Sequence, residues 1–159
     1  MRHLNRSNAH RQQSECALLS EEDLAQFRTL LGDNKTIPAS FEEFLRTYNG
    51  GTFDECVFEE TEEGPVVVST FFPVSGTEDE SINRQLGYFQ ETVGHGYIPF
   101  ADDPGGNYFL IGCNPDNAGV VFFWNHETRG MFEVSKSFSE FIDRLALDPW
   151  RELRQVAVK

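Results

Sequence analysis

The segment from Tyr97 to Glu127 contains two short apolar runs separated by a turn-rich loop. The runs at 107–112 and 120–125 have the aromatic and branched composition of buried strands, and the loop at 113–119 is rich in residues that turn easily. This pattern predicts a β-hairpin. Residues 98–101 predict a further strand that ends in a tight corner, because 102–107 combine a proline with two adjacent glycines. We therefore expect an antiparallel sheet at the centre of the fold, with helices covering one face.

Four stretches outside this segment have the apolar spacing of amphipathic helices. Ser20 predicts a polar cap at the first of them, and Ser40 with Glu43 and Ser137 with Glu140 predict capping boxes at two others. The apolar positions are Leu24, Phe27 and Leu31; Phe41, Phe44, Leu45 and Tyr48; Ile82, Leu86, Phe89 and Val93; and Phe138, Phe141, Ile142 and Leu145.

Three further β-type runs complete the predicted elements. Residues 56–58 and 66–72 predict a hairpin with an acidic tip at 59–64, and 130–134 predict one more strand. The resulting order of helices and strands predicts an α+β fold: a single domain with one mostly antiparallel sheet of about five to six strands, flanked by helices.

The amino-terminal residues differ from the rest. Residues 1–14 contain three arginines, two histidines and no acid, with almost no apolar side chain. We expect 1–19 to be a disordered extension and 20–159 to form the domain.

Length and cysteine content limit the classes of protein that fit. A chain of 159 residues can bury a sizeable core without disulfide bonds or a structural metal. The three cysteines, Cys16, Cys56 and Cys113, form no C-x-x-C pair. No apolar run approaches the roughly 18 residues of a membrane span, and no secretory signal begins the chain. The sequence predicts a cytoplasmic protein with reduced thiols, no membrane partner, no metal and no cofactor.

The negative charge is concentrated in one region. The net charge is −13, and residues 47–128 contain 14 acids against one base, Arg84, so the remainder is neutral with 12 of each. Such a region is a poor partner for nucleic acid, whose affinity comes largely from neutralisation of its phosphates. A basic protein is a better partner, because charge attraction speeds association. The predicted partner-binding residues are Asp54, Glu55, Glu59, Glu60, Glu62, Glu63, Glu78, Asp79, Glu80, Asp102 and Asp103.

Two motifs allow an alternative interpretation as chemical sites. The run 102–107 could be a calcium loop, but it lacks the alternating oxygen ligands of an EF-hand, which favours a structural corner. His126 and Glu127, with His95 and the acids Asp102 and Asp103, could serve a hydrolase, although adjacent strand residues face opposite ways. No G-x-S-x-G or phosphate-binding loop is present in the sequence.

Three segments together resemble the SUKH superfamily, the Smi/Knr-type domain. The first is 37–51, IPASFEEFLRTYNGG; the second is YIPFA at 97–101 with GGNY at 105–108, VVFFW at 120–124 and His126-Glu127; the third is the helix at 137–145. The chain departs from the family where an acid often ends the first hairpin strand, here Cys113 or Asn114. The motif residues in this chain are Pro38, Asn49, Gly50, Gly51, Pro99, Gly105, Gly106, Asn107 and Trp124.

The resemblance implies a mostly antiparallel sheet flanked by helices, and a function in binding. Bacterial members act as immunity proteins that bind and neutralise a polymorphic toxin, commonly a nuclease or deaminase. Fungal relatives act as regulatory interaction proteins in cell-wall control. We therefore expect a protein partner, a basic toxin domain in the first case, and no catalytic residue.

Overall fold

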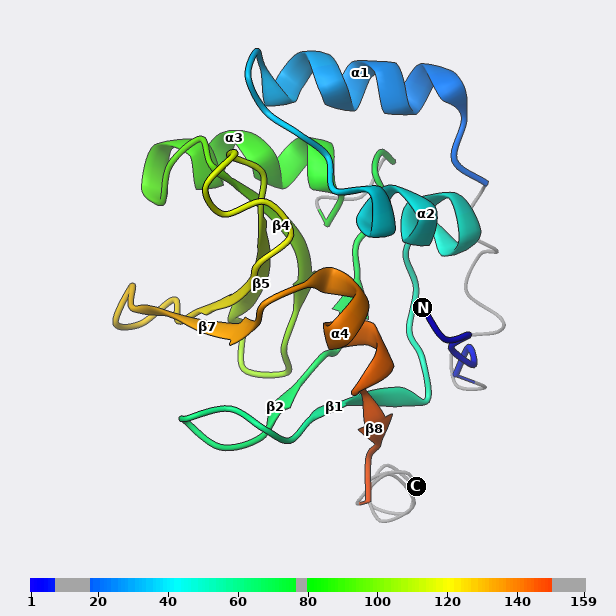
Figure 1. The fold of residues 1–159 in the computed structure, drawn as a ribbon, viewed down its shortest axis with the longest axis vertical. Helices are drawn as coiled ribbons and strands as arrows, with labels where there is room; N and C mark the ends of the chain where they lie inside the picture. Colours follow the sequence, from blue (N-terminus) through cyan, green and yellow to red (C-terminus); the bar gives the residue numbers. More distant parts are fainter. Residues whose placement is uncertain (8–17, 77–79, 150–159) are drawn as a thin grey trace.

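The computed structural model describes residues 1–7, 18–76 and 80–149. Within these residues the chain forms two antiparallel sheets and four helices, α1 (Glu21–Leu31), α2 (Ala39–Tyr48), α3 (Ile82–Thr92) and α4 (Phe138–Asp143) (Figure 1). The predicted α+β fold class is confirmed. No helix in the described part of the chain combines the length and apolar character that a membrane span requires.

The larger sheet has five strands in the order β3-β4-β5-β6-β7. The predicted central hairpin is confirmed, since β5 and β6 pair from Tyr108 opposite Trp124 to Ile111 opposite Val121. β7 lies at one edge of this sheet. The strand bounds are β3 (Thr70–Phe71), β4 (Tyr97–Asp102), β5 (Tyr108–Gly112), β6 (Val121–Trp124) and β7 (Met131–Ser135).

A second sheet of three strands has the order β2-β1-β8, where β1 is Glu55–Phe58, β2 is Val66–Val67 and β8 is Ala146–Leu147. The expectation of one sheet is therefore corrected. The run 66–72 divides, because Val67 pairs with Val57 of β1 whereas Thr70 pairs with Asp102 of β4. β8 is too short to show a strand pattern in the sequence, and it exists because β1 offers an edge to pair with.

Aromatic side chains fill both faces of the larger sheet. Successive strand residues face opposite ways, so Phe109 and Phe123 enter the main core with α2 and α4, whereas Leu110 and Trp124 pack against Phe89 of α3. Helices therefore cover both faces, where we expected one. Trp124 is therefore part of the core, with only 3% of it exposed.

Three of these four helices begin with a serine cap; the caps of α1 and α4 were predicted, whereas that of α3 was not. The hydroxyls of Ser20, Ser81 and Ser137 accept a hydrogen bond from the backbone N–H three residues ahead, which caps α1, α3 and α4. α2 instead begins after Pro38, with no side-chain cap. The capping box predicted for Ser40 and Glu43 is wrong, because Ser40 already lies inside the helix. The residue at the N-cap position is Pro38, whose ring fixes its backbone φ angle.

The turn after α2 accounts for the Asn-Gly-Gly motif. Asn49 adopts a left-handed conformation with φ 44°, and its side-chain oxygen accepts a hydrogen bond of 3.0 Å from the N–H of Val74. A Cβ on Gly50 would lie 2.7 Å from the backbone nitrogen of Pro73, so no larger residue fits there without movement. The motif therefore joins α2 to the segment that follows β3.

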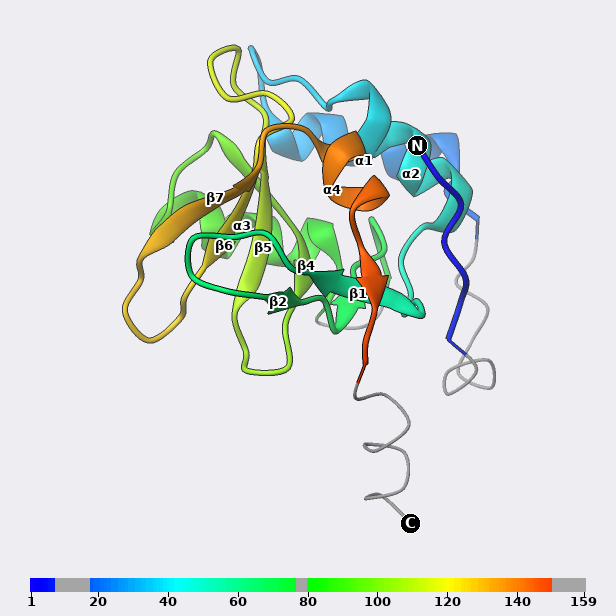
Figure 2. The same cartoon turned by 60° about the horizontal axis from the view of Figure 1, so that its bottom comes forward.

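Residues 1–7 pack against the domain, which differs from the expected disorder. Leu4 is buried, and the guanidinium of Arg6 lies over the rings of Tyr48 and Phe53 while donating to the carbonyl of Tyr48 at 2.7 Å. The segment covers the end of α2 and the start of β1 (Figure 2). The remainder of the predicted extension up to residue 17 lies outside the described residues.

Candidate protein-binding surface

The β1–β2 hairpin ends in a tight turn that presents a row of carboxylates. Thr61 organises the turn, because its hydroxyl contacts the carbonyl of Gly64 and accepts from the N–H of Glu63 at 3.2 Å. Gly64 has φ 91°, which a side-chain-bearing residue rarely adopts. All four glutamates of the turn are exposed: Glu59, Glu60, Glu62 and Glu63.

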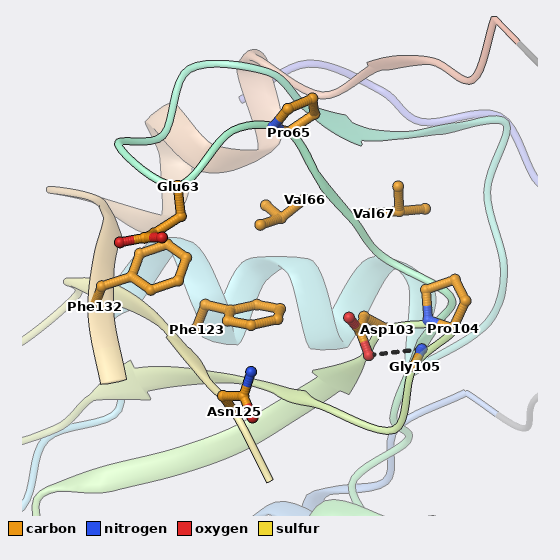
Figure 3. Close-up of a pocket in the computed structure, with 10 residues that line it drawn as sticks. All are labelled: Glu63, Pro65, Val66, Val67, Asp103, Pro104, Gly105, Phe123, Asn125 and Phe132. Carbon is orange, nitrogen blue, oxygen red and sulfur yellow. Dashed lines mark hydrogen bonds between the residues drawn. The ribbon is translucent and has the colours of Figure 1, made fainter. Parts of the chain in front are cut away.

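One side of this hairpin faces the larger sheet across an open groove of about 510 Å³ (Figure 3). Phe123 and Phe132 lie together in it, with ring centroids 5.2 Å apart. Glu63 and Asp103 lie on opposite sides, one on the hairpin and the other on the β4–β5 corner. The groove thus combines an aromatic base with carboxylates at its margins, and both acids are among those predicted from the sequence.

The β4–β5 corner is held by its own side chains. One carboxylate oxygen of Asp103 accepts from the N–H groups of Gly105 at 2.9 Å and Asn107 at 2.7 Å, and the other accepts from the Asn107 amide at 3.1 Å. These donors occupy the oxygens that a calcium loop would use, so the geometry is that of a structural corner. Among the described residues, no group of three or more metal-ligating side chains is placed to hold an ion.

The residues predicted for a hydrolase site do not all come together in the structure. The Asn107 side-chain oxygen lies 2.7 Å from the His126 ring nitrogen, and Nε2 of His126 is 4.0 Å from an exposed Glu127 oxygen. His95 lies just before the start of β4. His126 lies near the other end of β4, because it follows Trp124, and Trp124 pairs with Tyr108, which in turn pairs with Asp102 at the end of β4. The two histidines are therefore at opposite ends of the strands and do not converge.

Asp102 is partly buried and has a structural partner. Its carboxylate accepts a 3.0 Å hydrogen bond from the N–H of Thr70, which ties β3 to β4. Burial raises the pKa of Asp102 to about 6, and the neighbouring charge of Glu80 adds to this. Asp102 therefore contributes less to an exposed charged surface than the sequence pattern suggested.

The acids at the start of β1 lie away from the hairpin tip. Glu55 is buried and accepts from the backbone and side chain of Asn5; these bonds outweigh the effect of burial and lower its pKa. Asp54 lines a separate hollow formed by residues 3–6 and the end of α2. Neither belongs with the hairpin acids in one surface. Glu80 is exposed, while Glu78 and Asp79 lie outside the described residues.

The other side of the hairpin faces β7 across a second groove, which the sequence did not predict. The acids that line this groove come from three elements distant in sequence, so no local pattern groups them. The one available signal was the alternating pattern of residues 131–135, which could have indicated an exposed edge strand. The residues that line it are Phe58, Glu60, Thr61, Glu62, Phe132, Glu133, Val134, Ser135, Lys136, Glu140 and Arg144.

The SMI1 / KNR4 family (SUKH-1) model matches residues 18–144, a range that includes all four helices and the residues that line both grooves. A search of curated proteins finds no match for this chain. The match covers most of the chain, and its range includes the Asn-Gly-Gly turn, the central hairpin and the serine-capped helix α4 described above. This protein therefore belongs to the SMI1 / KNR4 family (SUKH-1).

Proposed function

We propose that this protein is an immunity protein that binds a basic toxin domain, such as a nuclease or deaminase, and blocks its active site. The observation that carries the proposal is the hairpin tip, where four exposed glutamates stand beside a groove floored by Phe123 and Phe132. Family membership supports a protein partner. Neutralisation would occur in the cytoplasm, by binding and without any bond-breaking step.

Charge and apolar contact have separate parts in this proposal. Exposed carboxylates attract a basic partner during approach and raise the association rate, whereas a buried aromatic contact slows dissociation. We name Glu59, Glu60, Glu62, Glu63 and Asp103 as the binding acids. Glu80 and Asp102 remain candidates for the margin of this surface, and Asp54 and Glu55 are left out because they lie at the far end of β1. The roles of Glu78 and Asp79 stay predictions from the sequence.

The test needs the cognate toxin, which is to be sought among the genes adjacent to that of this protein. Reversing Glu59, Glu60, Glu62 and Glu63 to lysine should slow association at least tenfold at low salt and abolish growth protection. A control reverses four exposed acids elsewhere, Glu22, Asp33, Glu91 and Asp116, for the same change in net charge. Equal association rates for the two variants, measured by stopped flow, would refute the proposed surface.

A further inference from the structure

β7 is an edge strand with one open side. It pairs with β6 on its inner side, from Trp124 opposite Met131 to Val121 opposite Ser135. No other strand of residues 1–7, 18–76 or 80–149 pairs with it. An open strand edge presents backbone N–H and C=O groups that can accept a further strand from another chain.

The second groove runs beside this open edge. Four of the five β7 residues line it, Phe132 to Ser135, and the hairpin tip forms the opposite wall with Glu60 and Glu62. Its volume of about 510 Å³ leaves room for an extended segment. In Figures 1 and 2 the hairpin tip and β7 lie on the same side of the molecule.

The charges of this groove indicate what it accepts. Carboxylates of Glu60, Glu62, Glu133 and Glu140 line it, against the cations of Lys136 and Arg144. Arg144 shows that the groove binds a guanidinium through ion pairs, because its guanidinium lies 2.6 Å from a Glu60 oxygen and 3.1 Å from a Glu140 oxygen. The groove thus holds one guanidinium between the hairpin and α4, and the carboxylates of Glu62 and Glu133 also line it.

We propose that β7 accepts an extended, lysine- or arginine-rich segment of the partner as an added antiparallel or parallel strand. Side chains alternate along a strand, so every second residue of that segment would face the hairpin glutamates, while its backbone pairs with β7. The five residues of β7 span about 17 Å, which sets the length of the paired stretch. This inference rests on the proposed function for the identity of the partner, and it adds how the partner binds.

A second copy of this chain is a poorer occupant of the same edge. Pairing two β7 strands would bring the exposed Glu133 carboxylates of two molecules together, on chains that each carry a net charge of −13. Like charges close to each other across paired strands destabilise the pairing. The basic segment has the opposite charge and avoids this repulsion.

The test uses a synthetic peptide of alternating lysine and valine, long enough to span β7. We expect it to bind at low salt and to slow amide hydrogen exchange of residues in 131–135 at least tenfold, measured by NMR. A peptide of the same sequence methylated at every backbone nitrogen keeps its charge but cannot donate hydrogen bonds, and should lose both effects. A glutamate-valine peptide should not bind.

Variants separate the groove from general attraction to a negative protein. Glu62→Lys and Glu133→Lys should each weaken binding of the lysine-valine peptide about fivefold. Glu127→Lys is the control, because Glu127 is exposed beside β7 but does not line the groove, and it should change affinity less than twofold.

Four outcomes would overturn the inference: no peptide binding, binding without protection of β7 amides, equal binding of the methylated peptide, or a dimer of the free protein with β7 already protected. Failure here is distinguishable from failure of the proposed function. A toxin that is neutralised while β7 amides stay unprotected in the complex would leave the immunity function standing and remove strand addition. Protection by the peptide without any toxin binding would do the reverse.

Discussion

Single residues in this protein show how position decides what a carboxylate does. Asp102 and Asp103 are adjacent and chemically identical, yet Asp102 is partly buried at the end of β4 with a raised pKa, while Asp103 accepts three N–H donors at the corner. Glu55 forms a third case, since the amino-terminal segment folds over it and satisfies it with Asn5. Type and spacing alone could not separate these roles.

Replacing Asp102 with asparagine should make the protein more stable at neutral pH. The pKa of Asp102 rises from 3.8 to about 6 on folding, so the unfolded chain loses the proton first. The stability that this group contributes is complete below about pH 4 and is lost as the pH rises through about 6. Because the carboxyl is partly exposed, solvent screening reduces the effect to about 1 kcal/mol. The side-chain oxygen of the introduced asparagine would still accept from the N–H of Thr70.

Urea unfolding from pH 4 to 8 measures this difference. The free energy of unfolding of Asp102→Asn should equal that of the wild type near pH 4 and exceed it at pH 7. Asp103→Asn is the control: it removes the same charge one residue along but weakens charge-assisted bonds at the corner, so no gain is expected. Parallel curves for Asp102→Asn and the wild type would contradict the prediction.

Among the elements, α2 and α4 begin with the same sequence signal but differ in how they start. Ser137 caps α4 through a 3.1 Å bond from the N–H of Glu140, and the Glu140 carboxylate turns to Arg144 instead of completing the box. Ser40 lies inside the first turn of α2, after Pro38, and caps nothing.

Two matched substitutions test this difference between the helices. Ser137→Ala should lower the free energy of unfolding by about 1 kcal/mol, because a helix-end N–H loses its acceptor. Ser40→Ala should change it by less than about 0.5 kcal/mol, because alanine favours a helix interior. Thermal and urea unfolding of both variants would measure the effects, and equal losses at the two sites would show that Ser40 does act as a cap.

At the scale of the whole molecule, the net charge of −13 opposes folding, because like charges repel each other in the compact state. The amino-terminal segment brings Arg2 and Arg6 to the domain, whereas the hairpin tip gathers four glutamates, of which Glu60 pairs with Arg144. Self-repulsion of this kind is screened by salt.

Added sodium chloride should therefore stabilise the wild-type protein. Neutralising the four hairpin glutamates to glutamine should reduce this dependence, since the repulsion that salt screens would be smaller. Urea midpoints at low and moderate ionic strength provide the measurement, and neutralising Glu22, Asp33, Glu91 and Asp116 to the corresponding amides provides the control with the same net charge. A larger reduction in the hairpin variant would locate the repulsion there, whereas equal values would mean that the charge acts as a whole.

The sequence by itself determined the helices, the central hairpin and the family. Their signals are local: apolar spacing along 41–48, serine caps, and turn residues between apolar runs all act within a few positions. The acidic tip was also predicted, because Glu59, Glu60, Glu62 and Glu63 are neighbours in the chain.

Only the tertiary structure decided how strands and charges were grouped. β8 and the division of 66–72 between two sheets depend on which edges were free to pair, and the second groove joins Glu60, Glu133 and Glu140 across more than seventy residues of chain. Likewise, Asn5 of the amino-terminal segment donates to Glu55, which is buried although it is a carboxylate. Pairing and burial are contacts between distant segments, and their free energy does not appear in any local run of residues.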